Sequence, residues 1–191
     1  IAITGPEARR DGHAWRARAC AILTGAGTVR DDDPRLTVRD IETDRQPLRV
    51  VVDSHMETPP TARILEGGNA LVVAATEDAA KIAALRAAGA EVIVLPNPNG
   101  KVDLPRLLQA LAGRGVNELH VEAGHKLNGS LLREGLVDEL LLYFAPTILG
   151  SGREMFPLPE LTDLCGRHDL KIVDLRRIGS DIRILARPLA A

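Results

Sequence analysis

The sequence predicts an α/β fold built around a mostly parallel β-sheet. Between residues 70 and 145, short apolar runs alternate with stretches whose leucines and alanines recur at helical spacing. Near the end of the chain, two β-branched stretches flank the turn 178–180, which is typical of an antiparallel hairpin. The first pattern favours βαβ units with helices on both faces of the sheet, and the second adds an antiparallel C-terminal ribbon.

The first third of the chain divides at glycines and prolines. Thr4 or Gly5 can cap a helix whose first turn contains Pro6. Continuous apolar or valine-rich runs further on are typical of buried parallel strands. In chain order, we expect a helix over 6–18, a strand over 21–23, extended backbone over 36–38, a strand over 49–53 and mostly loop over 56–69.

The remaining elements follow from the same two periodicities. We expect strands over 70–75, 90–95, 118–122 and 137–145, helices over 77–88, from 103 onward and over 124–134, and hairpin strands over 171–177 and 181–187. The strand over 137–145 is expected to continue the parallel run.

Composition limits the classes of function. The chain has 191 residues, 45% of them hydrophobic, which is enough for one sizeable core. A net charge of −2 and an aromatic content of 2% argue against nucleic-acid binding. No apolar run approaches the roughly 20 residues that span a bilayer. Cys20 and Cys165 are far apart and form no CxxC motif, so we expect reduced thiols and a cytoplasmic protein.

Residues 21–39 combine a strand, two glycines, three aspartates and flanking arginines. A strand that ends in this way is suited to a polar ligand. The pair Gly25 and Gly27 is not a Rossmann fingerprint, because Arg30 occupies the place of the third glycine. A Mg²⁺ site at 31–33 is disfavoured, since adjacent side chains in a loop diverge.

Two motifs near residue 122 exclude familiar chemistry. The turn 124–130 has the spacing of a phosphate-binding loop without its lysine, which argues against nucleotide hydrolysis but leaves a helix N-terminus that attracts an anion. His120 and Glu122 mimic the H-x-E of zinc deaminases, but no PCxxC follows. We therefore expect no metal site and no deaminase activity.

Five segments together resemble one family, the pyrimidine reductase of bacterial riboflavin biosynthesis, which is the reductase half of a bifunctional deaminase–reductase. They are ITGPEARRDGH (3–13), AILTGAGTVRDDDPRLTVR (21–39), VVVDS (50–54), VEAGHKLNGSLL (121–132) and LVDELLLYFAPTILG (136–150). The resemblance implies a dihydrofolate-reductase-like fold, in which a mixed, mostly parallel sheet carries helices on both faces and an antiparallel C-terminal ribbon.

The resemblance also implies an activity, namely NADPH-dependent reduction of 5-amino-6-(5-phosphoribosylamino)uracil, with hydride transfer to C1′ of the opened ribose. It identifies no catalytic residue, and water or the substrate can supply the proton. It assigns substrate contacts to Arg16, Leu36, Arg39 and Glu122, and NADPH contacts to Thr28, Asp32, Ser54, Gly124, His125, Lys126, Leu127, Asn128, Gly129 and Ser130.

The chain departs from the family pattern at its start. Ala2 stands where family members usually carry tryptophan, and the family's initial strand with its SLDG-type loop is missing, as is the deaminase half. We expect residues 1–191 to form a single reductase domain. Two alternatives stay open: a dihydrofolate-reductase-like reductase of another substrate, and a catalytically impaired NADP(H)-binding subunit. The long apolar strand over 137–145 suggests a homodimer.

Overall fold

The computed structural model describes residues 2–152 and 154–189. Its elements, in chain order, are α1 (Pro6–Arg18), β1 (Ala21–Gly25), α2 (Ala26–Asp32), β2 (Leu48–Val52), η1 (Arg63–Leu65), β3 (Ala70–Ala74), α3 (Ala79–Ala87), β4 (Ala90–Val94), α4 (Leu104–Gly113), β5 (Leu119–Val121), α5 (His125–Arg133), β6 (Leu140–Phe144), η2 (Leu164–Gly166), β7 (Leu170–Ile178) and β8 (Asp181–Pro188).

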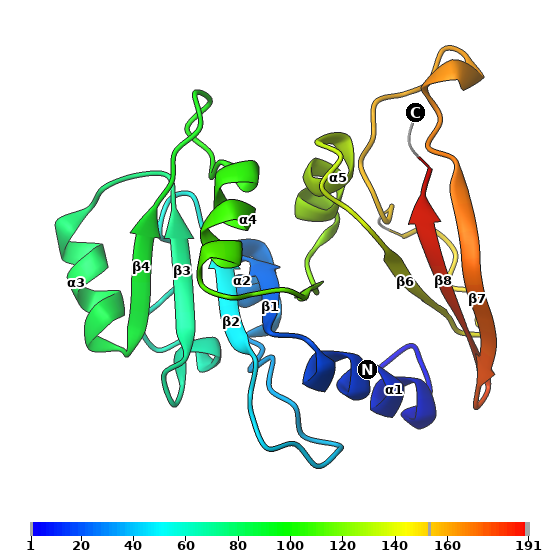
Figure 1. The fold of residues 1–191 in the computed structure, drawn as a ribbon, viewed down its shortest axis with the longest axis horizontal. Helices are drawn as coiled ribbons and strands as arrows, with labels where there is room; N and C mark the ends of the chain where they lie inside the picture. The colour runs from blue at the N-terminus through cyan, green and yellow to red at the C-terminus, as the bar shows by residue number, and fades with distance from the viewer. Residues whose placement is uncertain (1, 153, 190–191) are drawn as a thin grey trace.

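Five strands form a parallel sheet in the order β4-β3-β2-β1-β5 (Figure 1). One face packs against a core that includes Leu85 of α3 and Ile64 of η1. The other face packs against Leu107 of α4 and Leu131 of α5. The predicted parallel sheet with helices on both faces is therefore confirmed.

A separate antiparallel sheet has the order β6-β8-β7. The predicted hairpin of β7 and β8 is confirmed, but the prediction that 137–145 continues the parallel run was wrong. Residues of β6 pair antiparallel with β8, from Leu140 opposite Ala186 to Phe144 opposite Ile182. An apolar run predicts a strand but does not determine its partner, because pairing depends on contacts distant in the sequence.

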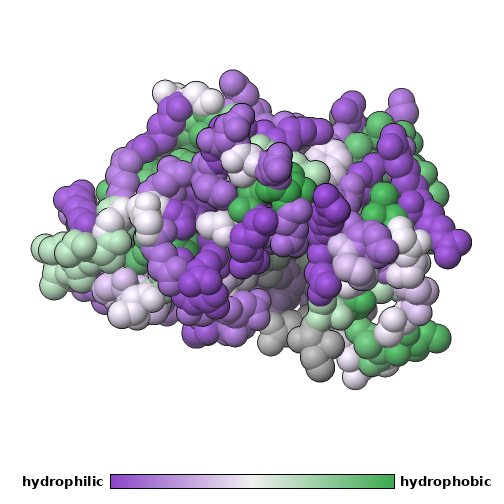
Figure 2. Space-filling model, turned by 90° about the horizontal axis from the view of Figure 1, so that it is seen from below, coloured by the Kyte–Doolittle hydropathy of each residue, from purple (hydrophilic) through white to green (hydrophobic). Residues whose placement is uncertain are grey.

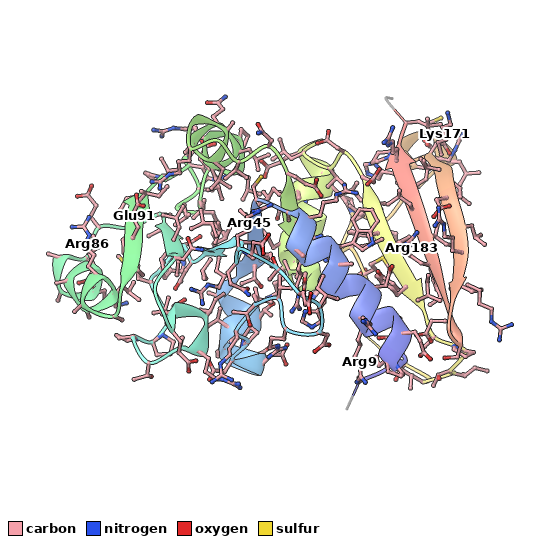
Figure 3. The ribbon with its side chains drawn as sticks, turned by 60° about the horizontal axis from the view of Figure 1, so that its bottom comes forward. Arg9, Arg45, Arg86, Glu91, Lys171 and Arg183 are labelled. Carbon is pink, nitrogen blue, oxygen red and sulfur yellow. The ribbon has the colours of Figure 1, made fainter. Side chains whose placement is uncertain are left out.

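Helix α1 connects the two sheets, as Figure 1 shows. Its Asp11 carboxylate accepts hydrogen bonds from Tyr143 Oη at 2.5 Å and from Arg183 Nη1 at 3.0 Å, both in the antiparallel sheet. Figure 3 shows Arg183 on this sheet facing the helix. Near its other end, Arg16 pairs with Glu122, which follows β5. One helix thereby fixes the position of each sheet relative to the other.

The extended backbone predicted over 36–38 is interrupted at its first residue. Leu36 has a φ of 49°, in the left-handed region, and its side chain lies in the core. Val38 is held instead by a side chain, because its N–H donates to Gln46 Oε1 at 2.8 Å and its C=O accepts from Gln46 Nε2 at 3.0 Å. The side-chain amide of Gln46 thus makes the two hydrogen bonds that the backbone of a neighbouring strand would make with Val38. The spacing of apolar residues cannot show whether the partner is a side chain or a strand.

Within residues 2–152 and 154–189, no helix is long and apolar enough to cross a membrane.

Candidate active site

A cavity of about 1470 Å³ lies between the two sheets. Its walls include residues of β5 and β6, the edge strands that face each other, together with one side of α1. Arg16, Arg39, Glu122 and Asn128, four of the predicted site residues, line it. The fold therefore brings residues that are more than 100 positions apart in the sequence to the walls of one cavity.

Arg16 and Glu122 form a two-pronged ion pair inside this cavity. Arg16 Nε lies 2.5 Å from Glu122 Oε1 and Nη2 lies 2.6 Å from Oε2. Nη1 donates to the C=O of Thr37 at 3.2 Å, and His120 Nε2 lies 3.3 Å from Glu122 Oε1. Because the fork of the guanidinium matches the carboxylate, the pair fixes the direction in which Glu122 points.

The pair changes the acidity of Glu122. Burial opposes ionisation of this carboxyl, but the hydrogen bonds from Arg16 and His120 outweigh burial and lower its pKa to about 2. At neutral pH Glu122 is thus a carboxylate, which can accept hydrogen bonds but carries no proton to donate.

This pKa predicts a pH dependence of stability. Since the pKa falls from 4.5 to about 2 on folding, the stabilisation is complete above pH 4.5 and disappears as the pH falls through about 2. After allowance for partial exposure, its loss should cost about 2 kcal/mol. Urea unfolding across this pH range should show a steeper fall in the free energy of unfolding for the wild type than for Glu122→Gln. Parallel curves would contradict the assignment.

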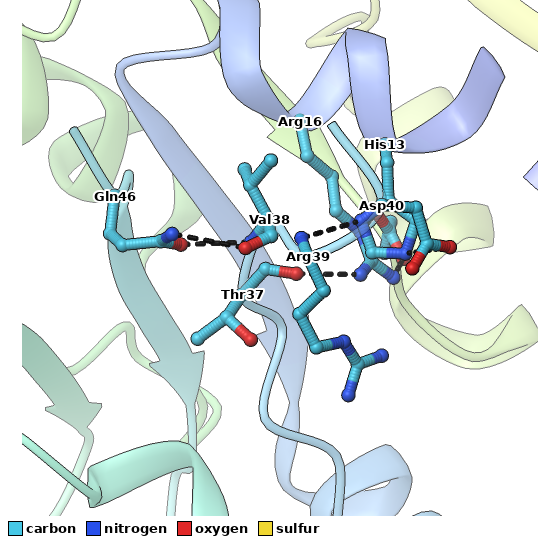
Figure 4. Close-up of polar contacts among 8 residues, drawn as sticks. His13, Arg16, Thr37, Val38, Arg39, Asp40 and Gln46 are labelled. Carbon is cyan, nitrogen blue, oxygen red and sulfur yellow. Dashed lines mark hydrogen bonds and ion pairs between the residues drawn. The ribbon is translucent and has the colours of Figure 1, made fainter. Parts of the chain in front are cut away.

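Arg39 lies beside the pair with its guanidinium exposed. Figure 4 shows this side chain pointing away from the neighbouring contacts. Its backbone N–H donates to His13 Nδ1 at 3.3 Å, and His13 Nε2 lies 3.3 Å from Asp40 Oδ2. Burial of His13, together with the charge of Arg16, lowers the pKa of this imidazole, so the neutral ring positions Arg39 through its backbone. Across the described residues, no acidic partner occupies the Arg39 guanidinium.

A second group of residues lies at the carboxyl ends of β1 and β5. Gly124 begins α5 without a capping side chain, whereas Asp78 caps α3 and Asp103 caps α4. A Cβ added to Gly124 would lie 3.7 Å from Thr28 Oγ1. No capping side chain accepts a hydrogen bond at the start of α5, and an exposed glycine there leaves room for a ligand. This arrangement fits the diphosphate of a dinucleotide.

Other predicted cofactor contacts have structural partners. Ser54, just beyond β2, accepts from the N–H of Val102 at 3.2 Å. Asn128 Nδ2 donates to the C=O of Ala123, and Ser130 Oγ donates to the C=O of Lys126, each at 3.1 Å. Leu127 packs against Gly25, His125 is half-buried, Lys126 and Asp32 are exposed, and Gly129 is buried against Pro157.

No group of three His, Cys, Asp or Glu side chains in the described parts of the chain is placed to hold a metal ion. Both cysteines are free thiols, with Cys20 half-buried and Cys165 exposed.

The comparisons with known proteins agree with this geometry. A model of the family described as the RibD C-terminal domain matches residues 1–184. The chain belongs to this family. It is 37% identical over 193 residues to the riboflavin biosynthesis protein RibD of Escherichia coli strain K12. This match covers 94% of this chain and 52% of the Escherichia coli protein.

Two further relatives extend the likeness. The chain is 38% identical over 187 residues to the 2,5-diamino-6-ribosylamino-4(3H)-pyrimidinone 5′-phosphate reductase of Methanothermobacter thermautotrophicus, covering 94% of this chain and 85% of that one. RibD of Acinetobacter baumannii (form 2) matches with a TM-score of 0.86 and 32% identity over 99% of this chain and 52% of its own. The predicted fold class is confirmed. The chain spans about half the length of its bacterial RibD relatives.

Sequence analysis missed several residues of this RibD C-terminal domain. Three of them, His13, Asp11 and Tyr143, lie at or beside the cavity. Of these, only His13 could have been identified from the sequence, through its position on the helix. His13 precedes Arg16 by three residues, so both lie on one face of α1. The contact of Asp11 with Tyr143 joins residues 132 positions apart, and no local pattern encodes it.

Proposed function

We propose that the chain is an NADPH-dependent reductase of 5-amino-6-(5-phosphoribosylamino)uracil in riboflavin biosynthesis. One observation carries the proposal: the fixed carboxylate of Glu122 lies two residues before the uncapped start of α5 at Gly124. A hydrogen-bond acceptor for a pyrimidine or sugar is therefore adjacent to a site suited to a dinucleotide phosphate. Membership of the RibD family, and the reductase name of the archaeal relative, support the same activity.

The residues divide the work of binding. The exposed guanidinium of Arg39 holds the 5-phosphate, and Glu122 accepts hydrogen bonds from the sugar or the pyrimidine. Arg16, whose charge is satisfied by Glu122, orients that carboxylate. The nicotinamide supplies hydride when it is bound, and the first turn of α5 holds its diphosphate. Alignment of C1′ within the cavity, away from bulk water, is the contribution of the protein.

The direct test is turnover. Purified protein, NADPH and the phosphorylated ribosylaminopyrimidine should consume the cofactor in equal amount to a ribitylamino product identified by mass spectrometry. Omission of either reactant is the control. Binding of NADPH without turnover would favour the alternative of an impaired NADP(H)-binding subunit, and absence of NADPH binding would contradict the proposal.

A second substrate is favoured by the archaeal relative. Its name specifies a 2,5-diamino-6-ribosylamino-4(3H)-pyrimidinone 5′-phosphate, which differs from the uracil compound at the pyrimidine ring. Comparison of kcat/KM for the two compounds decides between them. We expect the uracil compound to react faster, and a higher value for the diamino compound would reassign the substrate.

Gly124 provides a test of the cofactor site. A Cβ there meets only Thr28 Oγ1 at 3.7 Å, an ordinary contact, so Gly124→Val should fold. Its branched side chain should obstruct the diphosphate and weaken NADPH binding by about tenfold or more. Calorimetry measures this affinity, and unchanged binding would remove Gly124 from the site.

Gly129 is the matched control. A Cβ at this residue would lie 2.7 Å from Pro157 Cδ, so Gly129→Ala should lower stability. The folded fraction of this variant should bind NADPH with the affinity of the wild type, because Gly129 faces Pro157 and not the open turn at Gly124. Loss of affinity in this variant without loss of stability would place Gly129 in the cofactor site.

We also propose a cytoplasmic homodimer. Except for Ile3, every large hydrophobic residue exposed in the described structure lies between residues 144 and 189. Strand register places Phe144, Ile182 and Leu175 on one face of the antiparallel sheet, opposite the face that carries Arg183. Figure 2 shows hydrophobic residues gathered on the side of the molecule that holds this sheet. Analytical ultracentrifugation should find a dimer that Leu175→Asp dissociates, and a monomeric wild type would contradict it.

A final proposal concerns domain organisation. Residues 1–191 form one reductase domain. In a longer chain that includes the initial strand expected from the family resemblance, this strand lies between β5 and β6. The open edges of these strands on either side of the 1470 Å³ cavity support this place. Hydrogen exchange should then be slower over 119–121 and 140–144 in the longer chain. Unchanged exchange would contradict it.

A further inference from the structure

Side chains, rather than a neighbouring strand, hold the backbone of residues 37–39, as Figure 4 shows. Arg16 Nη1 donates to the C=O of Thr37 at 3.2 Å. The side-chain amide of Gln46 donates to the C=O of Val38 at 3.0 Å and accepts from its N–H at 2.8 Å. A guanidinium keeps its charge and an amide stays neutral at the pH of ordinary assays. These two contacts therefore do not change with pH.

The third contact of this segment depends on a titratable side chain. The N–H of Arg39 donates to His13 Nδ1 at 3.3 Å, so Nδ1 is the unprotonated nitrogen of the ring. His13 Nε2 lies 3.3 Å from Asp40 Oδ2, where the carboxylate accepts the proton of the ring. These two neighbours select one tautomer of the neutral imidazole. A second proton on the ring would set an N–H of the imidazolium against the N–H of Arg39, and two donors form no hydrogen bond.

The surroundings of His13 keep its ring neutral at neutral pH. The residue is 8% exposed, and burial, followed by the positive charges of Arg16 and Arg39, lowers the pKa of its imidazole below the ordinary value of 6.5. The carboxylates of Asp40 and Glu122 raise this pKa but do not cancel the lowering. The ring therefore gains its second proton only in acid, and the contact with Arg39 is intact at neutral pH.

Residues 39 and 40 separate two hollows of the surface. Arg39 and Asp40 line the cavity of about 1470 Å³, and they also line a second hollow of about 530 Å³ whose other walls are Arg10, Ile41 and Glu42. The side chain of Arg39 is exposed and has space on either side. The position of its backbone therefore decides which hollow its guanidinium enters.

We propose that His13 is a positioning residue for Arg39: the neutral imidazole holds the backbone of Arg39 where its guanidinium meets the 5-phosphate of the substrate, and protonation of the ring releases it. The inference rests on the proposed function, because it takes Arg39 as the phosphate contact. It goes further by making the affinity for the phosphate depend on one proton. The affinity should fall as the pH drops through the pKa of His13, and a dephosphorylated substrate should not show this fall.

Calorimetry with ribose 5-phosphate tests the inference without cofactor or turnover. The wild type is compared with His13→Asn, which places an amide oxygen near the position of Nδ1 and carries no titratable group. The two proteins should bind equally at about pH 7.5, and the variant should bind about three- to tenfold more tightly than the wild type at about pH 5. The phosphate also titrates, near pH 6, but it does so equally in both experiments. The difference between the two proteins therefore belongs to His13.

His13→Ala removes the acceptor and should bind ribose 5-phosphate about three- to tenfold more weakly than the wild type at about pH 7.5. In steady-state kinetics, this loss should appear in KM for the phosphorylated substrate with kcat nearly unchanged, and a role in stability alone would not produce that split. His168→Ala is the matched control. It removes an exposed imidazole between η2 and β7 and should bind like the wild type at both pH values.

Far-ultraviolet circular dichroism verifies that each variant folds, and if His13→Ala does not, the comparison of His13→Asn with the wild type decides. Equal affinities of those two proteins at about pH 5 would overturn the inference while turnover persists. Failure of the wild type to bind ribose 5-phosphate would also overturn it. Absence of turnover by the wild type, with binding that still depends on His13, would instead overturn the proposed function and leave the positioning role of His13.

Discussion

Replacement of Arg16 by alanine is expected to lower kcat/KM by about a hundredfold and the free energy of unfolding by about 2 kcal/mol. The variant leaves the half-buried Glu122 carboxylate without the two hydrogen bonds, of 2.5 and 2.6 Å, that hold it. The pKa of Glu122 should rise, and the carboxylate should lose its fixed direction. Steady-state kinetics and urea unfolding measure the two effects.

Arg18 supplies a matched control on the same helix. Its Nε lies 2.6 Å from Glu118 Oε1, but both side chains are more than one-third exposed. Exposed ion pairs contribute roughly 0.2–1 kcal/mol, so Arg18→Ala should have little effect on either measurement. Equal losses in the two variants would mean that Arg16 acts only as an ordinary helix-surface charge.

Replacement of Arg39 by alanine is expected to lower kcat/KM for the phosphorylated substrate by about ten- to a hundredfold. The guanidinium is exposed and lines the cavity, while its backbone N–H is held by His13. Lysine keeps the charge but loses the fork, so Arg39→Lys should retain part of the activity. A dephosphorylated substrate should react poorly with the wild type and be nearly insensitive to either substitution.

The affinity for NADPH separates the two possible roles of Arg39. It should be unchanged, because Arg39 lines the cavity that holds Glu122 and is separate from the turn at Gly124. Arg35→Ala, which breaks an exposed pair with Glu66, controls for loss of one positive charge in the same loop. If Arg39→Ala weakens NADPH binding and spares the phosphorylated substrate, Arg39 binds a cofactor phosphate instead.

Helices α3 and α4 were predictable because their starts are encoded locally, whereas α2 (Ala26–Asp32) was not expected. Asp78 and Asp103 cap α3 and α4 one residue before each helix begins, close to the expected starts. The partner of β6 was not predictable, since its pairing with β8 joins residues about 40 positions apart or more. The spacing of apolar residues indicates whether a segment is a helix or a strand, but it does not indicate which strand that segment pairs with.

The arrangement of the expected site residues could not be predicted from the sequence. Arg16 and Glu122 were expected as two separate substrate contacts, yet they bind each other across 106 residues. Leu36 was expected to contact the substrate, but its side chain is 5% exposed and lies in the core. Gly129 was grouped with the cofactor turn, although its environment is the ring of Pro157. Such roles depend on which segments meet in three dimensions.

The attachment of both sheets to α1 has a mechanical consequence. Asp11 and Arg16 are five residues apart, about 7.5 Å along a rigid helix. A force on the antiparallel sheet reaches Asp11 through Tyr143 and Arg183. Because the helix moves as one body, that force also shifts the guanidinium that holds Glu122. A movement of the antiparallel sheet relative to the parallel sheet would therefore also change the alignment of the Glu122 carboxylate.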